Sequence, residues 1–188
     1  PRGIGVDTNA FNVAMERQRT EARKAWSGSG EAATEDIWFG VRDEFGATDF
    51  LGYETETAEG QIVALIVNGE RAQEAGKGAD VAIITNQTPF YGESGGQMGD
   101  TGIITIKDGS KITLQACVSD THKKLGTVVV HLSKIQKGSL KVGDDIILSV
   151  DTTRRNQLRA NHSATHLMHA ALREMLGEHV TQKGSLVS

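Results

Sequence analysis

Several features are scarce in this sequence, and each scarcity excludes a class of protein. The 188 residues include a single cysteine, Cys117, so a framework of disulfides is excluded and a reducing cytosol is favoured. No apolar run approaches the roughly 18 residues that a membrane-spanning helix needs, and the opening Pro1-Arg2-Gly3 does not have the form of a signal peptide. We therefore expect a cytoplasmic protein with no membrane partner.

Positive charge is not in excess either. The formal net charge is -4 at pH 7, so any contact with nucleic acid has to use a local basic patch rather than a basic surface. Glycine, by contrast, is abundant, with 22 of 188 residues, whereas an average protein has roughly 7 %. This composition fits a chain with many tight turns.

The middle of the chain, from Thr48 to Val150, has the two-residue periodicity of β-strands. Apolar, β-branched runs are separated there by clusters of Gly, Asp, Asn or Lys. The runs cover residues 61–67, 81–85, 102–106, 112–118, 127–132 and 146–150. Short strands with no long helix between them predict a small antiparallel barrel or sandwich. Asp108-Gly109 predicts a tight hairpin turn.

Helical spacing appears on both sides of the strand region. Before it, the pattern predicts a helix from Asp7 to Trp26 and a short amphipathic segment from Asp36 to Phe45. After it, Asp151 is placed to cap a helix that either runs to Leu176 or breaks near Asn161.

The last residues of the sequence predict the end of that helix and one more element. Gly177 follows the helical pattern as a C-cap residue would. His179 to Ser185 then resembles the first strand of a further domain. Since the chain has no initial methionine and ends soon after this strand start, we expect a fragment of a longer polypeptide.

The expected fold class is therefore α+β. An N-terminal helix precedes a small antiparallel β-barrel, and the first helix of a truncated α/β domain follows. The expected boundaries are 1–46 for the helical segment and its linker, 47–150 for the barrel, and 151–188 for the start of the last domain.

One stretch on the last helix, Asn161 to His169, contains a candidate metal site. Helical residues four apart lie on the same face, so His162 and His166 can present two imidazoles to one point, with His169 one turn further on. Imidazole is the commonest zinc ligand, although ordinary surface histidines are the simpler alternative. A metalloprotease is excluded because Ser163 stands where the His-Glu-x-x-His motif has its glutamate.

The same pattern predicts how this helix packs. At about 100° per residue, the histidines lie on one side and Leu167, Met168 and Met175 lie on the other. We expect the apolar side to pack against the protein and the histidines to face away from it.

A glycine-rich loop, Thr88 to Asp100, is the second candidate site. Its core, Glu93-Ser94-Gly95-Gly96-Gln97, joins paired glycines to polar side chains. Paired glycines allow the backbone to come close to a ligand or to another chain segment, and they also suit a turn with positive φ. The pattern leaves both interpretations open.

These two stretches resemble the alanyl-tRNA synthetase family. The run from Asn161 to Arg173, followed by Gln182-Lys183-Gly184-Ser185, is similar to the start of that family's editing domain. The run from Thr88 to Gly102 is similar to its glycine-rich barrel signature. The segment from Val6 to Trp26 resembles the end of its helical tRNA-recognition region, so the likeness covers essentially the whole chain.

The resemblance implies a function and a set of partners. Members attach alanine to its tRNA with ATP, and a separate editing site hydrolyses tRNA mischarged with serine or glycine. A second sieve is needed because a pocket for a small side chain rejects close analogues only weakly. The ATP-binding core is expected outside this chain, and the acceptor end of tRNA(Ala) is the expected partner.

The resemblance also implies roles for individual residues. In members of the family, a His-x-x-x-His motif and a later Cys-x-x-x-His motif hold a zinc ion in the editing site. The first motif corresponds to His162 and His166, and the second has no counterpart in this sequence. Thr165 and Gln182 are the expected polar groups on the substrate side. The residues expected to contact RNA phosphates, with solvated surface charge as the alternative, are Arg154, Arg155, Arg159 and Lys183.

With two of four ligands, the fragment is expected to bind zinc weakly and to be inactive in deacylation. The missing half-domain should leave apolar surface exposed on the face from Ala164 to Met175, so we also expect self-association or a disordered C-terminus. Two alternatives are a free-standing alanyl-tRNA editing hydrolase and a non-catalytic barrel that binds RNA or protein. Gly95-Gly96-Gln97 is also the tripeptide of peptide-release factors, but its flanking residues fit the barrel signature better.

Overall fold

The computed structural model describes residues 13–15, 17 and 32–187, and it divides the chain into two compact units, 1–37 and 38–188. Of the expected helix from Asp7 to Trp26, Val13–Met15 and Arg17 are described and are helical. The rest of that helix and residues 27–30, where the sequence Ser-Gly-Ser-Gly has the composition of a flexible linker, lie outside the described residues.

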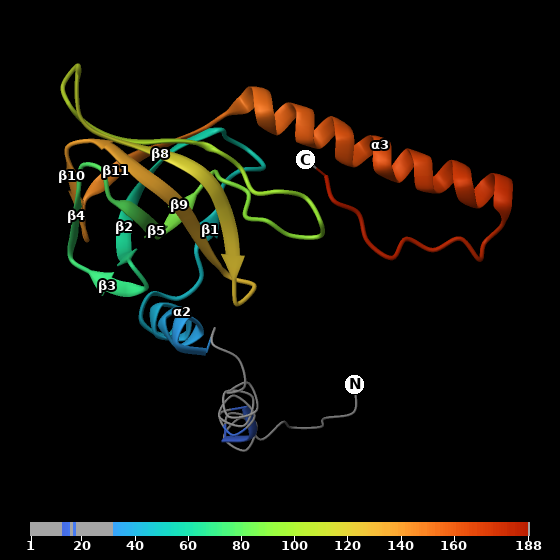
Figure 1. Cartoon of the computed structure of the whole chain (residues 1–188), viewed down its shortest axis with the longest axis horizontal. Helices are drawn as coiled ribbons and strands as arrows, with labels where there is room; N and C mark the ends of the chain where they lie inside the picture. The colour runs from blue at the N-terminus through green and yellow to red at the C-terminus, as the bar shows by residue number, and fades with distance from the viewer. Residues whose placement is uncertain (1–12, 16, 18–31, 188) are drawn as a thin grey trace, which may run out of the picture. The chain divides into compact units, whose positions relative to one another are not determined.

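The described elements follow one another from a short helix through the strand region to a long helix (Figure 1). The helices are α2 (Ala32–Phe45) and α3 (Thr152–Leu176). The strands are β1 (Asp49–Phe50), β2 (Thr57–Val67), β3 (Glu70–Ala72), β4 (Glu74–Gly76), β5 (Asp80–Thr85), β6 (Gln87–Thr88), β7 (Gly102–Asp108), β8 (Lys111–Lys124), β9 (Val128–Lys137), β10 (Ser139–Lys141) and β11 (Asp145–Val150). The expected α+β class is confirmed.

Six of the described strands close into an antiparallel barrel in the order β11-β7-β8-β9-β5-β2, and β11 pairs back onto β2. All six predicted strand runs are confirmed, most within somewhat longer strands. The Asp108-Gly109 turn is also confirmed: Asp108 pairs with Lys111 across it, and Gly109 has a φ of +57°. In Figure 1 the strands curve around a common core.

Alternate residues of the strands fill the barrel interior. In β11, for example, Ile146, Leu148 and Val150 are buried, and the residues between them are not. They pack with apolar side chains from all five of the other barrel strands, including Ile83 and Ile104. This alternation is what a strand with one buried face requires.

One histidine, His131 of β9, is wholly buried in this barrel. Its Nδ1 lies 2.9 Å from the Ile83 carbonyl oxygen, which can only accept, so Nδ1 carries the proton. Its Nε2 therefore accepts from the Thr88 hydroxyl, 2.8 Å away, and that hydroxyl oxygen accepts from the Phe90 N–H. Burial lowers the pKa of His131 from 6.5 to about 4, although the bond to Ile83 opposes this shift.

The helix α3 is continuous from Thr152 to Leu176, so of the two alternatives left by the sequence the unbroken helix is correct. Asp151 is its N-cap, and its carboxylate accepts from the Arg154 N–H at 3.0 Å. The C-cap is Gly177, whose N–H donates to the Arg173 carbonyl. Both predicted caps are confirmed.

The predicted strand at His179–Ser185 is wrong. The segment after α3 has no regular strand, and its β-type pairing in the described residues is a single bridge between Val187 and Gln97. A strand needs a neighbour to accept its backbone hydrogen bonds, and residues 179–185 have no such neighbour within the described part of the chain. Among the described helices, none is both long and apolar enough to cross a membrane.

The buried neutral histidine predicts a pH dependence of folding. The pKa of His131 is about 4 in the folded chain, whereas the ordinary value of an exposed histidine is 6.5. Protonation therefore favours the unfolded chain. This contribution to stability is complete above pH 6.5 and is lost as the pH falls from 6.5 to 4, by about 3 kcal/mol. Urea unfolding at pH 7, 5 and 4 should show a steeper loss for the wild-type chain than for His131→Gln. Equal losses in the two chains would contradict the assignment.

Candidate functional site

The two histidines predicted as metal ligands face each other on α3. Their Nε2 atoms are 2.8 Å apart and their ring centroids are 4.7 Å apart. Without a metal, one ring has to donate an N–H to the other, since two lone pairs would repel. Two nitrogens bound to one tetrahedral zinc would lie about 3.3 Å apart, given Zn–N bonds of about 2.05 Å. The present separation is within a small ring rotation of that geometry, so the pair fits two adjacent ligand positions.

Two other imidazole nitrogens on α3 have no hydrogen-bond partner within the described part of the chain. Nδ1 of His162 and Nε2 of His169 are both buried without a hydrogen bond in the described part of the chain. Metal-binding histidines usually donate their second ring nitrogen to a neighbouring oxygen. Among the described residues, no cluster of three His, Cys, Asp or Glu side chains is placed to hold a metal. The geometry is therefore that of a pair of ligands and not of a complete site.

The histidine face of α3 is also the face by which the helix begins to pack. At about 100° per residue, Arg155 lies in line with His162 and His166, and Leu158 lies close to that line. Arg155 and Leu158 are the buried residues of α3. The expectation that the histidines face away from the packing side is therefore wrong. A buried ion pair, and not the apolar stripe, attaches α3 to the barrel.

The opposite, apolar side of α3 is exposed, as expected for the face from Ala164 to Met175. Leu167, Met168 and Met175 are 72 %, 60 % and 81 % exposed. Self-association through this face stays a prediction.

The two expected substrate-side groups lie in different settings. Thr165 is half-buried on α3, and its hydroxyl donates to the Asn161 carbonyl at 2.9 Å. Gln182 is exposed in the extended segment that follows the helix. No hydrogen bond between the Gln182 side chain and the histidines is found in the described part of the chain.

The four residues expected to bind RNA divide into two kinds. Arg159 and Lys183 are exposed and stay candidates for phosphate contacts. Arg154 is half-buried and donates to the Gly99 carbonyl at 2.7 Å. Arg155 is 4 % exposed. The RNA-binding prediction for Arg155 is therefore wrong, because a buried guanidinium that is already ion-paired cannot reach a phosphate.

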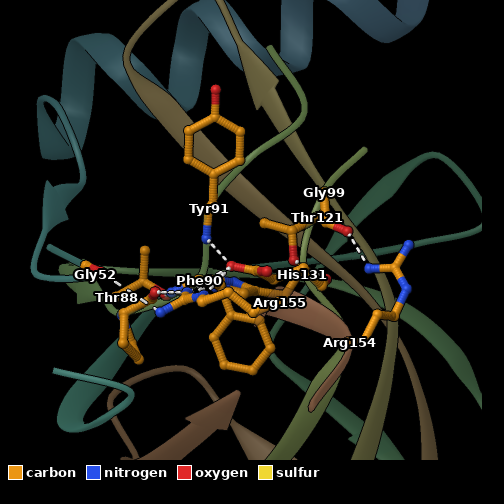
Figure 2. A network of polar contacts seen from close by, with 11 residues as sticks. Gly52, Thr88, Phe90, Tyr91, Gly99, Thr121, His131, Arg154 and Arg155 are labelled. Atoms are coloured by element: carbon orange, nitrogen blue, oxygen red, sulfur yellow. Dashed lines mark hydrogen bonds and ion pairs between the residues drawn. The ribbon is translucent and has the colours of Figure 1, made fainter. Parts of the chain in front are cut away.

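Arg155 instead joins α3 to the barrel. Its Nη2 forms an ion pair with Asp100 at 2.5 Å and also donates to the Pro89 carbonyl, while its Nε donates to the same Asp100 oxygen at 3.1 Å. That oxygen accepts from the Tyr91 N–H as well, at 2.6 Å. In Figure 2, Arg155 lies among Gly52, Thr88 and Phe90, while Arg154 reaches Gly99 to one side.

The backbone of Asp100 is held in place by the start of the glycine-rich loop and by β8. Its N–H donates to the Tyr91 carbonyl at 2.9 Å, and its own carbonyl accepts from the Thr121 hydroxyl of β8 at 2.8 Å. Sequence reasoning placed Asp100 at the end of the loop and gave it no role. An aspartate after Gly99 and an arginine in the first turn of the next helix are common features, and only the closed barrel brings them together.

The paired glycines form a tight turn and also allow another chain segment to come close to the loop. Gly95 and Gly96 have φ values of +60° and +82°, and Ser94 and Gln97 pair across them, as in a tight hairpin turn. The Gly96 carbonyl accepts from the Val187 N–H at 2.8 Å, and the Met98 N–H donates to the Val187 carbonyl at 3.2 Å. A Cβ on Gly96 would overlap the Ser185 carbonyl oxygen. The sequence left open a turn with positive φ and a close approach to a ligand or chain segment. The loop has the turn, and the segment that approaches it is the chain's own residues 185–187.

The chain is similar to known proteins along essentially its whole length. Residues 1–154 match the family described as tRNA synthetases class II (A). The chain belongs to this tRNA synthetase family. Among curated relatives of the family, it is 58 % identical to an alanine–tRNA ligase of Paramagnetospirillum magneticum over 99 % of the chain and 21 % of that protein. It is 59 % identical to an alanine–tRNA ligase of Rhizobium meliloti over 100 % of the chain and 20 % of that protein.

These matches confirm the resemblance of the sequence to alanyl-tRNA synthetases. The chain spans about a fifth of the length of the tRNA synthetases that it matches. The activity, substrates and partners of those whole proteins are therefore taken up below as proposals for this segment.

The two glycines of the turn provide a matched test of the close approach. Gly96→Ala should displace the segment from Ser185 to Val187, because its methyl group meets the Ser185 carbonyl. Hydrogen exchange at the Met98 and Val187 amides should then become faster. Gly95→Ala has the same positive φ but nothing within 4 Å of its Cβ, so it should add only backbone strain of about 1–2 kcal/mol. Equal exchange rates in the two variants would contradict this role of Gly96.

Proposed function

We propose that this segment provides the β-barrel and the first part of the editing site of an alanine–tRNA ligase. The observation that carries the proposal is the convergence of the His162 and His166 Nε2 atoms at one point on α3. It is supported by the similarity to alanine–tRNA ligases across the whole chain. The editing site would hydrolyse the ester of serine or glycine wrongly attached to tRNA(Ala).

His162 and His166 would bind zinc in this site, and a Cys-x-x-x-His from elsewhere in the full-length protein would supply the remaining ligands. When bound, zinc would polarise a water molecule or orient the ester. The chain's own residues bind and orient the substrate around it. The Thr165 hydroxyl and the Gln182 amide are suited to the ester carbonyl and to the hydroxyl of a mischarged serine.

The acceptor end of tRNA(Ala) is the proposed partner. Arg159 and Lys183 are exposed on α3 and on the segment that follows it, and both can contact phosphates. ATP-dependent attachment of alanine is assigned to the larger part of the ligase outside this segment. On this proposal residues 151–188 begin an editing domain after a barrel of 47–150 and a tRNA-recognition segment of 1–46, and the ligase is cytoplasmic.

The proposal is favoured over a free-standing editing hydrolase because the family match begins at residue 1 and includes the segment before the barrel. A non-catalytic barrel that binds RNA or protein gives no reason for two imidazoles to converge on one point.

Removing either histidine of the pair should impair editing but not the attachment of alanine. In the full-length ligase, His162→Ala or His166→Ala should slow deacylation of Ser-tRNA(Ala) at least as much as the roughly 10- to 100-fold loss typical when an outer-shell partner is removed. Attachment of alanine should be unchanged. His179→Ala is a matched control, because His179 is exposed and outside the pair. Unchanged deacylation in both pair variants would favour the non-catalytic reading.

The 188-residue segment alone should bind zinc weakly. Two imidazoles without further protein ligands cannot supply the roughly 10 kcal/mol or more of a complete structural site. Isothermal titration with zinc should show no saturation at stoichiometric concentrations, and the weak signal should disappear in the His162→Ala/His166→Ala double variant. Tight one-to-one binding would show that the described pair is not a partial site.

A further inference from the structure

We propose that Arg155 and Asp100 are positioning residues for the editing reaction, because their buried ion pair sets the direction and rotation of the helix that carries His162 and His166. This inference rests on the proposed function of the histidine pair. It assigns to Arg155 a role that excludes contact with RNA.

The attachment of α3 to the barrel is concentrated in its first two turns. Arg155 and Leu158 are the buried side chains of the helix, which runs on to Leu176. The Asp151 cap and the bond from Arg154 to Gly99 lie in the same region. Since the described part of the chain contributes no other buried α3 side chain, the path of the helix depends on the geometry at Arg155.

The Arg155 guanidinium is held from several directions at once. It donates to the Asp100 carboxylate through two nitrogens, to the Pro89 carbonyl, and more weakly to the Gly52 carbonyl at 3.5 Å. The planar group has donors in fixed directions, so these contacts restrain its rotation as well as its position. A lysine ammonium would keep the charge but would not restrain the rotation.

This restraint reaches the histidines through the helix itself. Arg155 and His162 are seven residues apart, close to two full turns, so both point to the same side of α3. His166 lies eleven residues from Arg155, which is about 16 Å along the axis, so a 10° change in helix direction would move it by about 3 Å. A displacement of about 1 Å at a reacting site can cost on the order of 100-fold in rate.

The test compares variants of the full-length ligase. Arg155→Lys keeps the charge, and Asp100→Asn keeps the shape of the side chain. Both should lower kcat for deacylation of Ser-tRNA(Ala) by about 10- to 100-fold. KM for the mischarged tRNA should change much less, because Arg155 does not contact the substrate. Attachment of alanine should be unchanged, and Arg155→Met should lose more activity than Arg155→Lys.

Two controls separate positioning from loss of folding and from failure of the proposed function. Leu114→Ala removes a side chain that is buried in the barrel core. We expect Leu114→Ala to keep its deacylation kcat even if its Tm falls as much as that of Arg155→Lys. If Leu114→Ala loses as much kcat as Arg155→Lys at the same Tm, the proposal is overturned. His162→Ala reports on the histidine pair.

If His162→Ala abolishes deacylation while Arg155→Lys and Asp100→Asn retain wild-type kcat, the positioning role is wrong and the proposed function stands. If His162→Ala retains wild-type kcat, both fall together, because no catalytic pair is then left to position.

Discussion

The geometry of the candidate site depends on the ion pair between Arg155 and Asp100. Both side chains are almost wholly removed from water, at 4 % and 1 % exposed. Burying two charges costs several kcal/mol per ion, which a single contact does not repay. Here the cost is offset by bonds from the Tyr91 N–H to the carboxylate and from the guanidinium to the Pro89 carbonyl. Such a pair adds little net stability, but losing one member typically costs about 3–5 kcal/mol, so the arrangement favours one orientation over others.

The glycine-rich loop serves two parts of the candidate site. At its ends, Pro89 and Asp100 hold the start of α3, and at its tip Gly96 and Met98 hold Val187. The chain thus leaves the barrel, forms the histidine helix and returns to the same loop. A larger residue at position 96 could not accept this return, so the paired glycines are required by the approach of the backbone as well as by the turn.

Local signals in the sequence were sufficient for the barrel and for the limits of α3. Alternating apolar residues predicted the six barrel strands, and Asp151 and Gly177 predicted the ends of the helix, because these features depend on neighbours in the chain. Four-residue spacing likewise brought His162 and His166 together. The failures concern contacts between distant residues. The ion pair joins residues 55 positions apart, and without it the exposed stripe of Leu167 and Met168 was the obvious packing face.

The central proposal is that His162 and His166, on a helix that the barrel holds in place, bind one ion in the full-length ligase. A crystal structure of the full-length ligase with zinc, recorded at the zinc absorption edge, tests it most directly. The anomalous peak should lie within bonding distance of Nε2 of both His162 and His166, with Arg155 still paired to Asp100. A peak away from these nitrogens, or an ion bound by only one of them, would contradict the account.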